Sequence, residues 1–185
     1  MRYRGLVAVI TAAAVIVTAT SVFALDGTRK GFVIGIGVGP GMTSYTIGNS
    51  DRESKFALAS DFKIGAGISE KLLVYYVSRV SWFSHDLPTE TVTAANGIGL
   101  VGSSYYFKTD VPSFYVLGSV GLSSWSYPFE STSDTWTGLG VSVGAGYEFA
   151  KHYAAEATVN WGNPGSDNVD VDALSFMVTV GVLAY

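Results

Sequence analysis

Apolar residues in this chain recur at every second position, and this alternation is the strongest constraint on its fold. Between residues 56 and 68 apolar side chains occupy even positions, and small or polar ones, among them Asp61 and Lys63, fall between them. Successive side chains of a β-strand point to opposite faces, so a period of two indicates a strand with one apolar face. A membrane-spanning helix needs about 20 apolar residues, and the longest apolar run after residue 24 covers only 72–77. The pattern therefore predicts an all-β chain.

The alternation appears in eight stretches, and the segments between them alternate in length. The predicted strands cover residues 31–45, 54–68, 72–84, 95–107, 113–127, 135–149, 153–161 and 173–185. The connections 69–71, 108–112 and 150–152 are short, whereas 46–53, 85–94, 128–134 and 162–172 are longer and rich in Asp, Gly, Ser, Thr and Pro. Short turns at one end and longer loops at the other are typical of membrane barrels. We therefore expect an eight-stranded antiparallel up-and-down transmembrane β-barrel with both termini at the short-turn, periplasmic end.

The composition excludes several other classes of protein. Charged residues make up 14% of the chain, against about 25% in an average soluble domain. The absence of cysteine excludes a disulfide scaffold and a thiolate metal site. The formal net charge of −4, without a basic run, argues against nucleic-acid binding. We expect neither a cofactor nor a metal.

Residues 1–24 have the three parts of a secretory signal peptide. A positively charged start at residues 1–4 precedes an apolar or small stretch, and Val22 and Ala24 place small residues before a cleavage point. We expect cleavage after residue 24 and a barrel domain over 25–185, exported to the outer membrane of a Gram-negative cell. The alternative, a retained N-terminal membrane anchor, fits the small-residue exit less well.

Aromatic residues collect near the ends of the predicted strands. Near the long loops lie Trp82, Trp125, Trp136 and Trp161, and near the short turns lie Tyr106, Tyr147, Tyr153 and Tyr185. Two aromatic belts separated by aliphatic strand centres match the girdles at the two interfaces of a membrane. We predict that these eight side chains are membrane-interface aromatics. The alternative is a general preference of aromatic residues for strand ends.

Five charged residues form a predicted lumenal set: Asp61, Lys63, Arg79, Glu148 and Glu156. Arg or Lys facing lipid at the midplane costs about 2–4 kcal/mol, so these positions should face inward. A turn centred on Glu70 places Asp61 opposite Arg79 and Lys63 diagonal to Arg79. We predict a cluster of these three residues, with Glu156 approaching across the barrel. We interpret it as structural pairing of buried charges, with a charge gate for small ions as the alternative.

Several segments in order resemble the small outer-membrane β-barrel family of the OmpA and OmpX type. They are "GFVIGIGVG", "SYYFK", "SFYVLGSVGLSSW", "GVSVGAGYEFAKHYAAEATVNW" and the final strand ending in Tyr185. The resemblance covers nearly all of 25–185. It implies assembly with periplasmic chaperones and the barrel-insertion machinery. We also expect a monomer in contact with outer-membrane lipid and lipopolysaccharide. The last strand departs from the pattern because it is apolar on both faces, so its lipid-facing side is not assigned.

The family also includes lipid A-modifying enzymes, which carry a His, a Ser and a carboxylate near the outer rim. Ser84, His85 and Asp86 are the only place where such a set could begin. Neighbouring residues of a strand point to opposite faces, so we predict no catalytic residue and no enzyme.

A barrel of eight strands has an interior that side chains can fill. We therefore expect a structural or surface-interaction role with a mostly filled interior. A narrow channel for small or hydrophobic solutes is the alternative, and a lipid A-modifying enzyme is less favoured. Carboxylates outnumber cations in the predicted outer loops. We interpret this as a hydrated surface, with divalent cations bridging to lipopolysaccharide as the alternative.

Overall fold

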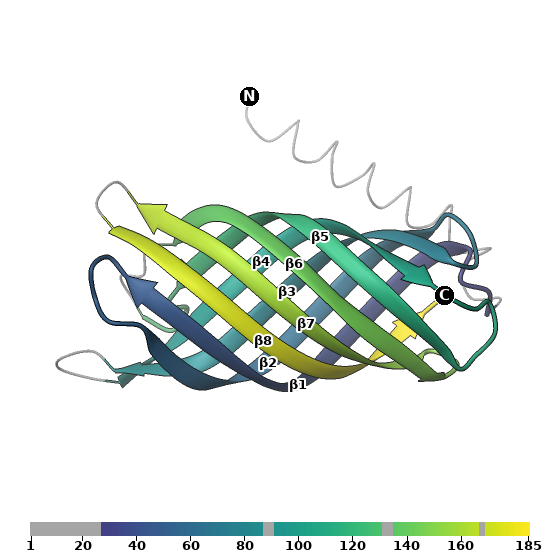
Figure 1. Cartoon of the computed structure of the whole chain (residues 1–185), viewed down its shortest axis with the longest axis horizontal. Coiled ribbons are helices and arrows are strands. Elements are labelled where there is room, and N and C mark those ends of the chain that lie inside the picture. Colours follow the sequence, from purple (N-terminus) through teal and green to yellow (C-terminus); the bar gives the residue numbers. More distant parts are fainter. Residues whose placement is uncertain (1–26, 87–90, 131–134, 167–168) are drawn as a thin grey trace, which may run out of the picture.

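Eight antiparallel strands close into a barrel in which β8 pairs with β1 (Figure 1). The computed structural model describes residues 27–86, 91–130, 135–166 and 169–185. The strands are β1 (Gly31–Ile47), β2 (Glu53–Gly67), β3 (Leu72–Asp86), β4 (Thr91–Tyr106), β5 (Ser113–Ser126), β6 (Trp136–Ala150), β7 (Tyr153–Ser166) and β8 (Val169–Ala184). The prediction of an all-β up-and-down barrel is confirmed. The predicted signal peptide lies outside the described residues.

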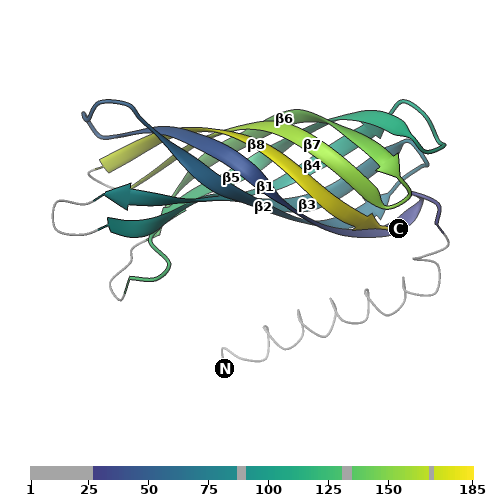
Figure 2. The same cartoon turned by 90° about the horizontal axis from the view of Figure 1, so that it is seen from below.

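The described residues include no helix that is long and apolar enough to cross a membrane. The turns β2–β3, β4–β5 and β6–β7 lie at the same end of the barrel as the carboxyl terminus, which we call the short-turn end (Figures 1 and 2). The connections β1–β2, β3–β4, β5–β6 and β7–β8 lie at the opposite, loop end (Figures 1 and 2). All eight strands are strongly tilted to the barrel axis (Figure 1).

The β7–β8 hairpin differs most from the predicted strands. β7 continues to Ser166 instead of ending at residue 161, and β8 begins at Val169 instead of residue 173. Ser166 pairs with Val169, so most of the predicted loop is strand. The strands have 14 to 17 residues, more than the roughly 9–11 residues that span a membrane. The Gly-, Asn- and Pro-rich residues that predicted a loop therefore lie in strand segments beyond the length needed for the span. The excess forms a paired rim at the loop end. β4 likewise begins earlier, at Thr91.

The two faces of the barrel wall have different chemistry. The outward face presents large apolar side chains, with Phe56 80% exposed and Ile36 64% exposed. The structure also assigns the faces of β8: Phe176, Val178 and Val180 are exposed, whereas the residues between them are buried. A wall that is apolar outside and polar or packed inside is the pattern of a barrel surrounded by lipid.

Two buried apolar clusters fill the interior, one towards each end. The cluster towards the short-turn end comprises Val33, Leu73, Tyr75, Val77, Ile98, Leu100, Tyr106, Tyr115, Leu117 and Tyr185. The cluster towards the loop end comprises Tyr45, Ala57, Phe83, Ala94, Trp125, Val171 and Ala173. Buried polar and charged side chains lie among and between them, and these carry the candidate site.

Candidate functional site

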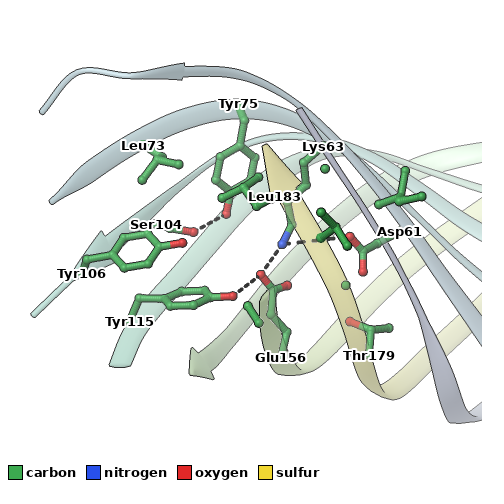
Figure 3. A pocket seen from close by; sticks show the side chains of 15 residues that line it. Asp61, Lys63, Leu73, Tyr75, Ser104, Tyr106, Tyr115, Glu156, Thr179 and Leu183 are labelled. Carbon is green, nitrogen blue, oxygen red and sulfur yellow. Dashed lines mark hydrogen bonds and ion pairs between the residues drawn. The ribbon is translucent and has the colours of Figure 1, made fainter. Parts of the chain in front are cut away.

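A buried ion cluster lies inside the barrel and is centred on Glu156 of β7. The Lys63 ammonium contacts the Glu156 carboxylate, and Arg79 Nη2 lies 3.5 Å from Glu156 Oε2. Tyr115 Oη donates a hydrogen bond of 2.7 Å to Glu156 Oε1. Figure 3 shows Lys63, Tyr115 and Glu156 converging from separate strands. Strand alternation explains the convergence, because each residue occupies an inward position of its strand.

The predicted pairing register in this cluster is confirmed, because Asp61 is the ladder partner of Arg79. The ion pairs differ from the predicted cluster of Asp61, Lys63 and Arg79. Arg79 bonds across the lumen to Ser142 Oγ at 3.4 Å and pairs with Glu156. Asp61 lies 4.0 Å from Lys63 Nζ, so Lys63 joins the two carboxylates.

A small cavity borders the ion cluster on the side of the short-turn end. Its volume is about 30 Å³, and its lining includes Asp61, Lys63, Tyr75, Ser104, Tyr115 and Glu156 (Figure 3). Tyr75 Oη and Ser104 Oγ are hydrogen-bonded at 2.7 Å. One water molecule needs roughly 10–15 Å³ measured in this way, so the cavity holds about two waters and no larger solute.

Glu148 is buried, as expected of a lumenal charge, but it belongs to a separate network at the short-turn end. Its partner is Arg29, whose Nε and Nη2 donate to Glu148 Oε2 at 2.8 and 2.5 Å. Tyr185 Oη donates to Glu148 Oε1 at 2.5 Å. Burial and this hydrogen bond raise the pKa of Tyr185 to about 12, so the phenol stays neutral at physiological pH.

The sequence reasoning did not identify Arg29, which is only 1% exposed. It precedes β1, where strand alternation assigns no face. The available signal was one basic residue two positions before a strand start, which is weak evidence for burial.

A hydrogen-bonded polar group lies next to the loop-end cluster. Thr43 Oγ1 is 2.6 Å from Ser81 Oγ and 2.8 Å from Ser175 Oγ, and Asn96 Nδ2 donates to Ser175 Oγ at 3.1 Å. These residues come from β1, β3, β8 and β4, so the group ties four strands together across the interior.

Aromatic side chains pack inside the loop end. The ring of Tyr45 lies 5.5 Å from Phe83 and 4.9 Å from Trp125. Tyr45 Oη is 2.7 Å from His85 Nδ1 and donates to Glu53 Oε2 at 2.9 Å. Trp125 is 0% exposed, so the indole fills the interior.

Half of the predicted interface aromatics therefore face the wrong way. Trp125, Trp136, Tyr106 and Tyr185 take inward positions, and Tyr106 and Tyr185 are only 2% and 3% exposed. The expectation that these four contact lipid is wrong, because proximity to a strand end does not determine the face. Trp82, Trp161, Tyr147 and Tyr153 do take outward positions.

Two outward tryptophans bond to neighbouring strands at the loop end. Trp82 Nε1 donates to Ser60 Oγ, and Trp161 Nε1 donates to Asp172 Oδ2, both at 2.9 Å. An apolar ring body with a paired N–H suits a membrane interface, where one side of the residue is apolar and the other is polar.

The Ser84–His85–Asp86 segment does not assemble a catalytic constellation. Ser84 and Asp86 are exposed, whereas His85 is buried and bonded to Tyr45. The strand alternation places the hydroxyl and the imidazole on opposite faces. Among the residues that the structure describes, no group of three or more His, Cys, Asp or Glu side chains is placed to hold a metal.

No protein-family model and no curated protein sequence matches the chain. Solved structures do match its fold. Neisserial surface protein A is 16% identical, with a TM-score of 0.56 over 83% of this chain and 96% of that one. Ail, the attachment invasion locus protein of Yersinia pestis, is 13% identical, with a TM-score of 0.52 over 82% of this chain and 98% of that one. The outer membrane protein OprG of Pseudomonas aeruginosa is 13% identical, with a TM-score of 0.51 over 87% and 99%. The chain therefore has the fold of the small eight-stranded outer-membrane β-barrels.

Proposed function

We propose that the protein is an integral outer-membrane barrel with a structural or surface-interaction role and a closed interior. The observation that carries this proposal is the contrast between the two faces of one wall. The outward face is a continuous display of exposed aliphatic and aromatic side chains, whereas the inward face carries paired charges and packed rings. Such a wall is stable with lipid outside and a filled core inside.

The filled interior supports a closed barrel over an open pore. From the short-turn end to the loop end, it contains the Arg29–Glu148 pair, the Glu156 cluster, the Thr43–Ser175 group and the Trp125 aromatic cluster. The cavity beside the Glu156 cluster has a volume of about 30 Å³. A continuous path for solutes would require these contacts to break.

We infer that lipid and lipopolysaccharide are the surrounding partners. Trp82 and Trp161 mark the loop end of the outward face, and Tyr147 and Tyr153 mark the short-turn end. Amphipathic rings at both levels anchor a barrel at the two interfaces. The loop end then faces the cell exterior, and the short-turn end faces the periplasm.

The loop end has the wrong charge for a polyanion. Ail was crystallised with sucrose octasulfate, a heparin analogue. Among the described residues at the loop end of this chain, the cations are Arg52 and Lys55, and both are paired with carboxylates. The carboxylates at this end are more numerous: Asp51, Glu53, Asp86, Glu130, Asp170 and Asp172. We therefore do not extend sulfate binding to this protein. Its contact with anionic lipopolysaccharide headgroups would run through divalent cations.

We also propose that the barrel has no lipid A-modifying activity, because Ser84 and His85 lie on opposite faces. Mass spectrometry of lipid A from cells with and without the protein tests this proposal. We expect identical lipid A. A mass shift that disappears in His85→Ala would overturn it.

Gel mobility of the outer-membrane fraction, with and without boiling in detergent, tests the location. We expect a band in the outer membrane that shifts on boiling, because a closed ladder resists detergent until heated. An unshifted band in the soluble periplasm would contradict the proposal. Planar-bilayer recording of the folded protein then tests the closed interior. Steady stepwise conductance would favour the narrow channel instead.

A further inference from the structure

The segment before β1 lies in the mouth of the barrel at the short-turn end. Its Arg29 guanidinium binds Glu148 of β6 through two nitrogens. The third nitrogen, Nη1, donates to the carbonyl oxygens of Thr109 at 2.9 Å, Lys108 at 3.1 Å and Glu70 at 3.3 Å. The planar fork of arginine suits such a multiple attachment. One side chain thus ties the segment to the β2–β3 turn, the β4–β5 turn and the end of β6.

Aromatic rings complete a layer around this guanidinium. The Arg29 Cζ lies 4.1 Å from the ring centre of Tyr106 and 6.0 Å from that of Tyr185. Tyr185 and the backbone N–H of His152 both donate to Glu148 Oε1, so the carboxyl terminus and the β6–β7 turn join the same layer. We call Arg29, Tyr106, Glu148 and Tyr185 the short-turn seal.

The seal separates two spaces that share no lining residue. Outside it lies an open depression of about 250 Å³, lined in part by Arg29, Glu70, Lys151 and Tyr185. Inside it lies the cavity of about 30 Å³, whose lining includes Tyr106, Leu183, Lys63 and Glu156. Arg29 lines the outer space, Tyr106 lines the inner one, and the two side chains are stacked on each other, so the seal lies between the two spaces.

The sealing segment is not part of the β-ladder. Residues 27–30 form bends without strand pairing, and β1 begins at Gly31. Withdrawal of the segment therefore breaks side-chain contacts and leaves the closed barrel intact. Local openings of this kind are low-energy excursions compared with global unfolding.

We propose that the Arg29 segment is a built-in strap that controls access of water from the short-turn end to the internal cavity. The proposal goes beyond the closed barrel inferred above, because it identifies the end that opens and the residue that holds it shut. It rests on the proposed membrane location only for the statement that this end faces the periplasm.

Gly67 provides a second, independent handle on the strap. A Cβ added at Gly67 would lie 1.6 Å from the Arg29 carbonyl oxygen. A Gly67→Ala change therefore displaces the strap by steric overlap while leaving the Arg29 charge in place. The Gly67→Ala variant therefore complements Arg29→Ala: the first displaces the strap and keeps the guanidinium, and the second removes the guanidinium.

The test measures the reactivity of a cysteine inside the seal. The chain has no cysteine of its own, so Thr179→Cys, at a buried position lining the cavity, is a single reporter. The folded protein in micelles is treated with a small charged methanethiosulfonate. We expect the labelling rate to rise by about tenfold or more in Arg29→Ala and Gly67→Ala, because both raise the population of the locally open state. Arg52→Ala, which removes an exposed arginine at the loop end, should leave the rate unchanged.

Each outcome decides the proposal. The proposal is overturned if the labelling rate is unchanged in Arg29→Ala and Gly67→Ala proteins that are folded, as judged by their gel shift on boiling. An equal rise of the labelling rate in Arg52→Ala would also overturn it. If Arg29→Ala does not fold, Gly67→Ala alone decides. A reagent that does not cross the outer membrane then gives the side of entry: faster labelling should appear only after the outer membrane is permeabilised. Because the micelle measurement does not depend on location, failure of the strap is distinguishable from failure of the proposed function.

Discussion

Asp61 lies opposite Arg79 in the β2–β3 ladder, yet the Arg79 guanidinium turns across the lumen and pairs with Glu156 of β7. Asp61 contacts the cluster only through Lys63, at 4.0 Å. Glu156 contacts Lys63, Arg79 and Tyr115 together. The two carboxylates of this cluster are therefore unequal, and Glu156 is the one that compensates the buried cations.

Glu156→Gln should lower the free energy of unfolding more than Asp61→Asn. The glutamine keeps the shape of the side chain but leaves Lys63 and Arg79 with only the distant Asp61 carboxylate. Leaving a buried charge uncompensated costs about 3–5 kcal/mol, so we expect a loss of that size for Glu156→Gln and a smaller one for Asp61→Asn. Urea unfolding in lipid vesicles, followed by tryptophan fluorescence, measures both. An equal or larger loss in Asp61→Asn would contradict this ranking.

The register of the Asp61–Arg79 pair could be predicted because it depends on local features. A tight turn at Glu70 and strand alternation determine which residues face each other. The partner of Arg79 could not be predicted in the same way. Glu156 lies on a strand that is distant in the sequence, and its reach across the lumen depends on the tilt and closure of the barrel.

The inward position of Trp125 is indicated by the alternation of residues in its own strand, although its place near a strand end suggested a membrane interface. Within 113–126, Trp125 shares its parity with Ser119 and Ser123, whereas Val120 and Leu122 have the opposite parity. Parity predicts that Trp125 faces inward, and the structure buries it. Arg29 is a different case, because no periodic pattern extends to the segment before the first strand.

Brominated lipid should distinguish the inward and outward tryptophans. In proteins that retain one tryptophan, with the others changed to Phe, bromine on the acyl chains should quench Trp82 and Trp161 strongly. Trp125 should be little affected, because it lies inside the wall with 0% exposure. Fluorescence in vesicles of brominated and ordinary phospholipid gives the ratio for each protein. Strong quenching of Trp125 would place its indole in lipid and contradict the aromatic cluster.

Gly146→Ala should destabilise the barrel, and Gly118→Ala should not. A Cβ at Gly146 would lie 2.2 Å from Tyr115 Cζ and would displace the phenol that bonds to Glu156. Overpacking of this kind costs about 1–3 kcal/mol. A Cβ at Gly118 meets no atom within 4 Å, and the expected change there is within about 0.5 kcal/mol. Urea midpoints of the two variants make the comparison.

A second substitution tests the cause of the Gly146 effect. Tyr115→Phe removes the hydroxyl that donates to Glu156 but keeps the ring that the new Cβ would strike. Adding Gly146→Ala to Tyr115→Phe should still be destabilising, whereas adding it to Tyr115→Leu should cost less. Equal costs in both backgrounds would show that the overlap with the ring is not the cause.

Alkaline pH should weaken the barrel through Tyr185, which follows the last strand. Burial, then the hydrogen bond from Tyr185 to Glu148 and the charge of that carboxylate, raise the pKa of Tyr185 to about 12 in the folded protein. The pKa of tyrosine in an unfolded chain is about 10. The folded state therefore holds the proton more tightly. Its stabilising contribution is complete below pH 10 and is lost as the pH rises towards 12.

Urea midpoints measured from pH 8 to pH 12 test this sign. The midpoint of the unaltered protein should fall above pH 10, and Tyr185→Phe should reduce the fall because it removes the titrating phenol. Tyr153→Phe is the matched control, since Tyr153 lies on the outward face at the same end and is 50% exposed. We expect this variant to follow the unaltered protein. A fall that is the same in Tyr185→Phe would mean that another group controls alkaline stability, because the Tyr185–Glu148 bond would then contribute nothing to the pH dependence.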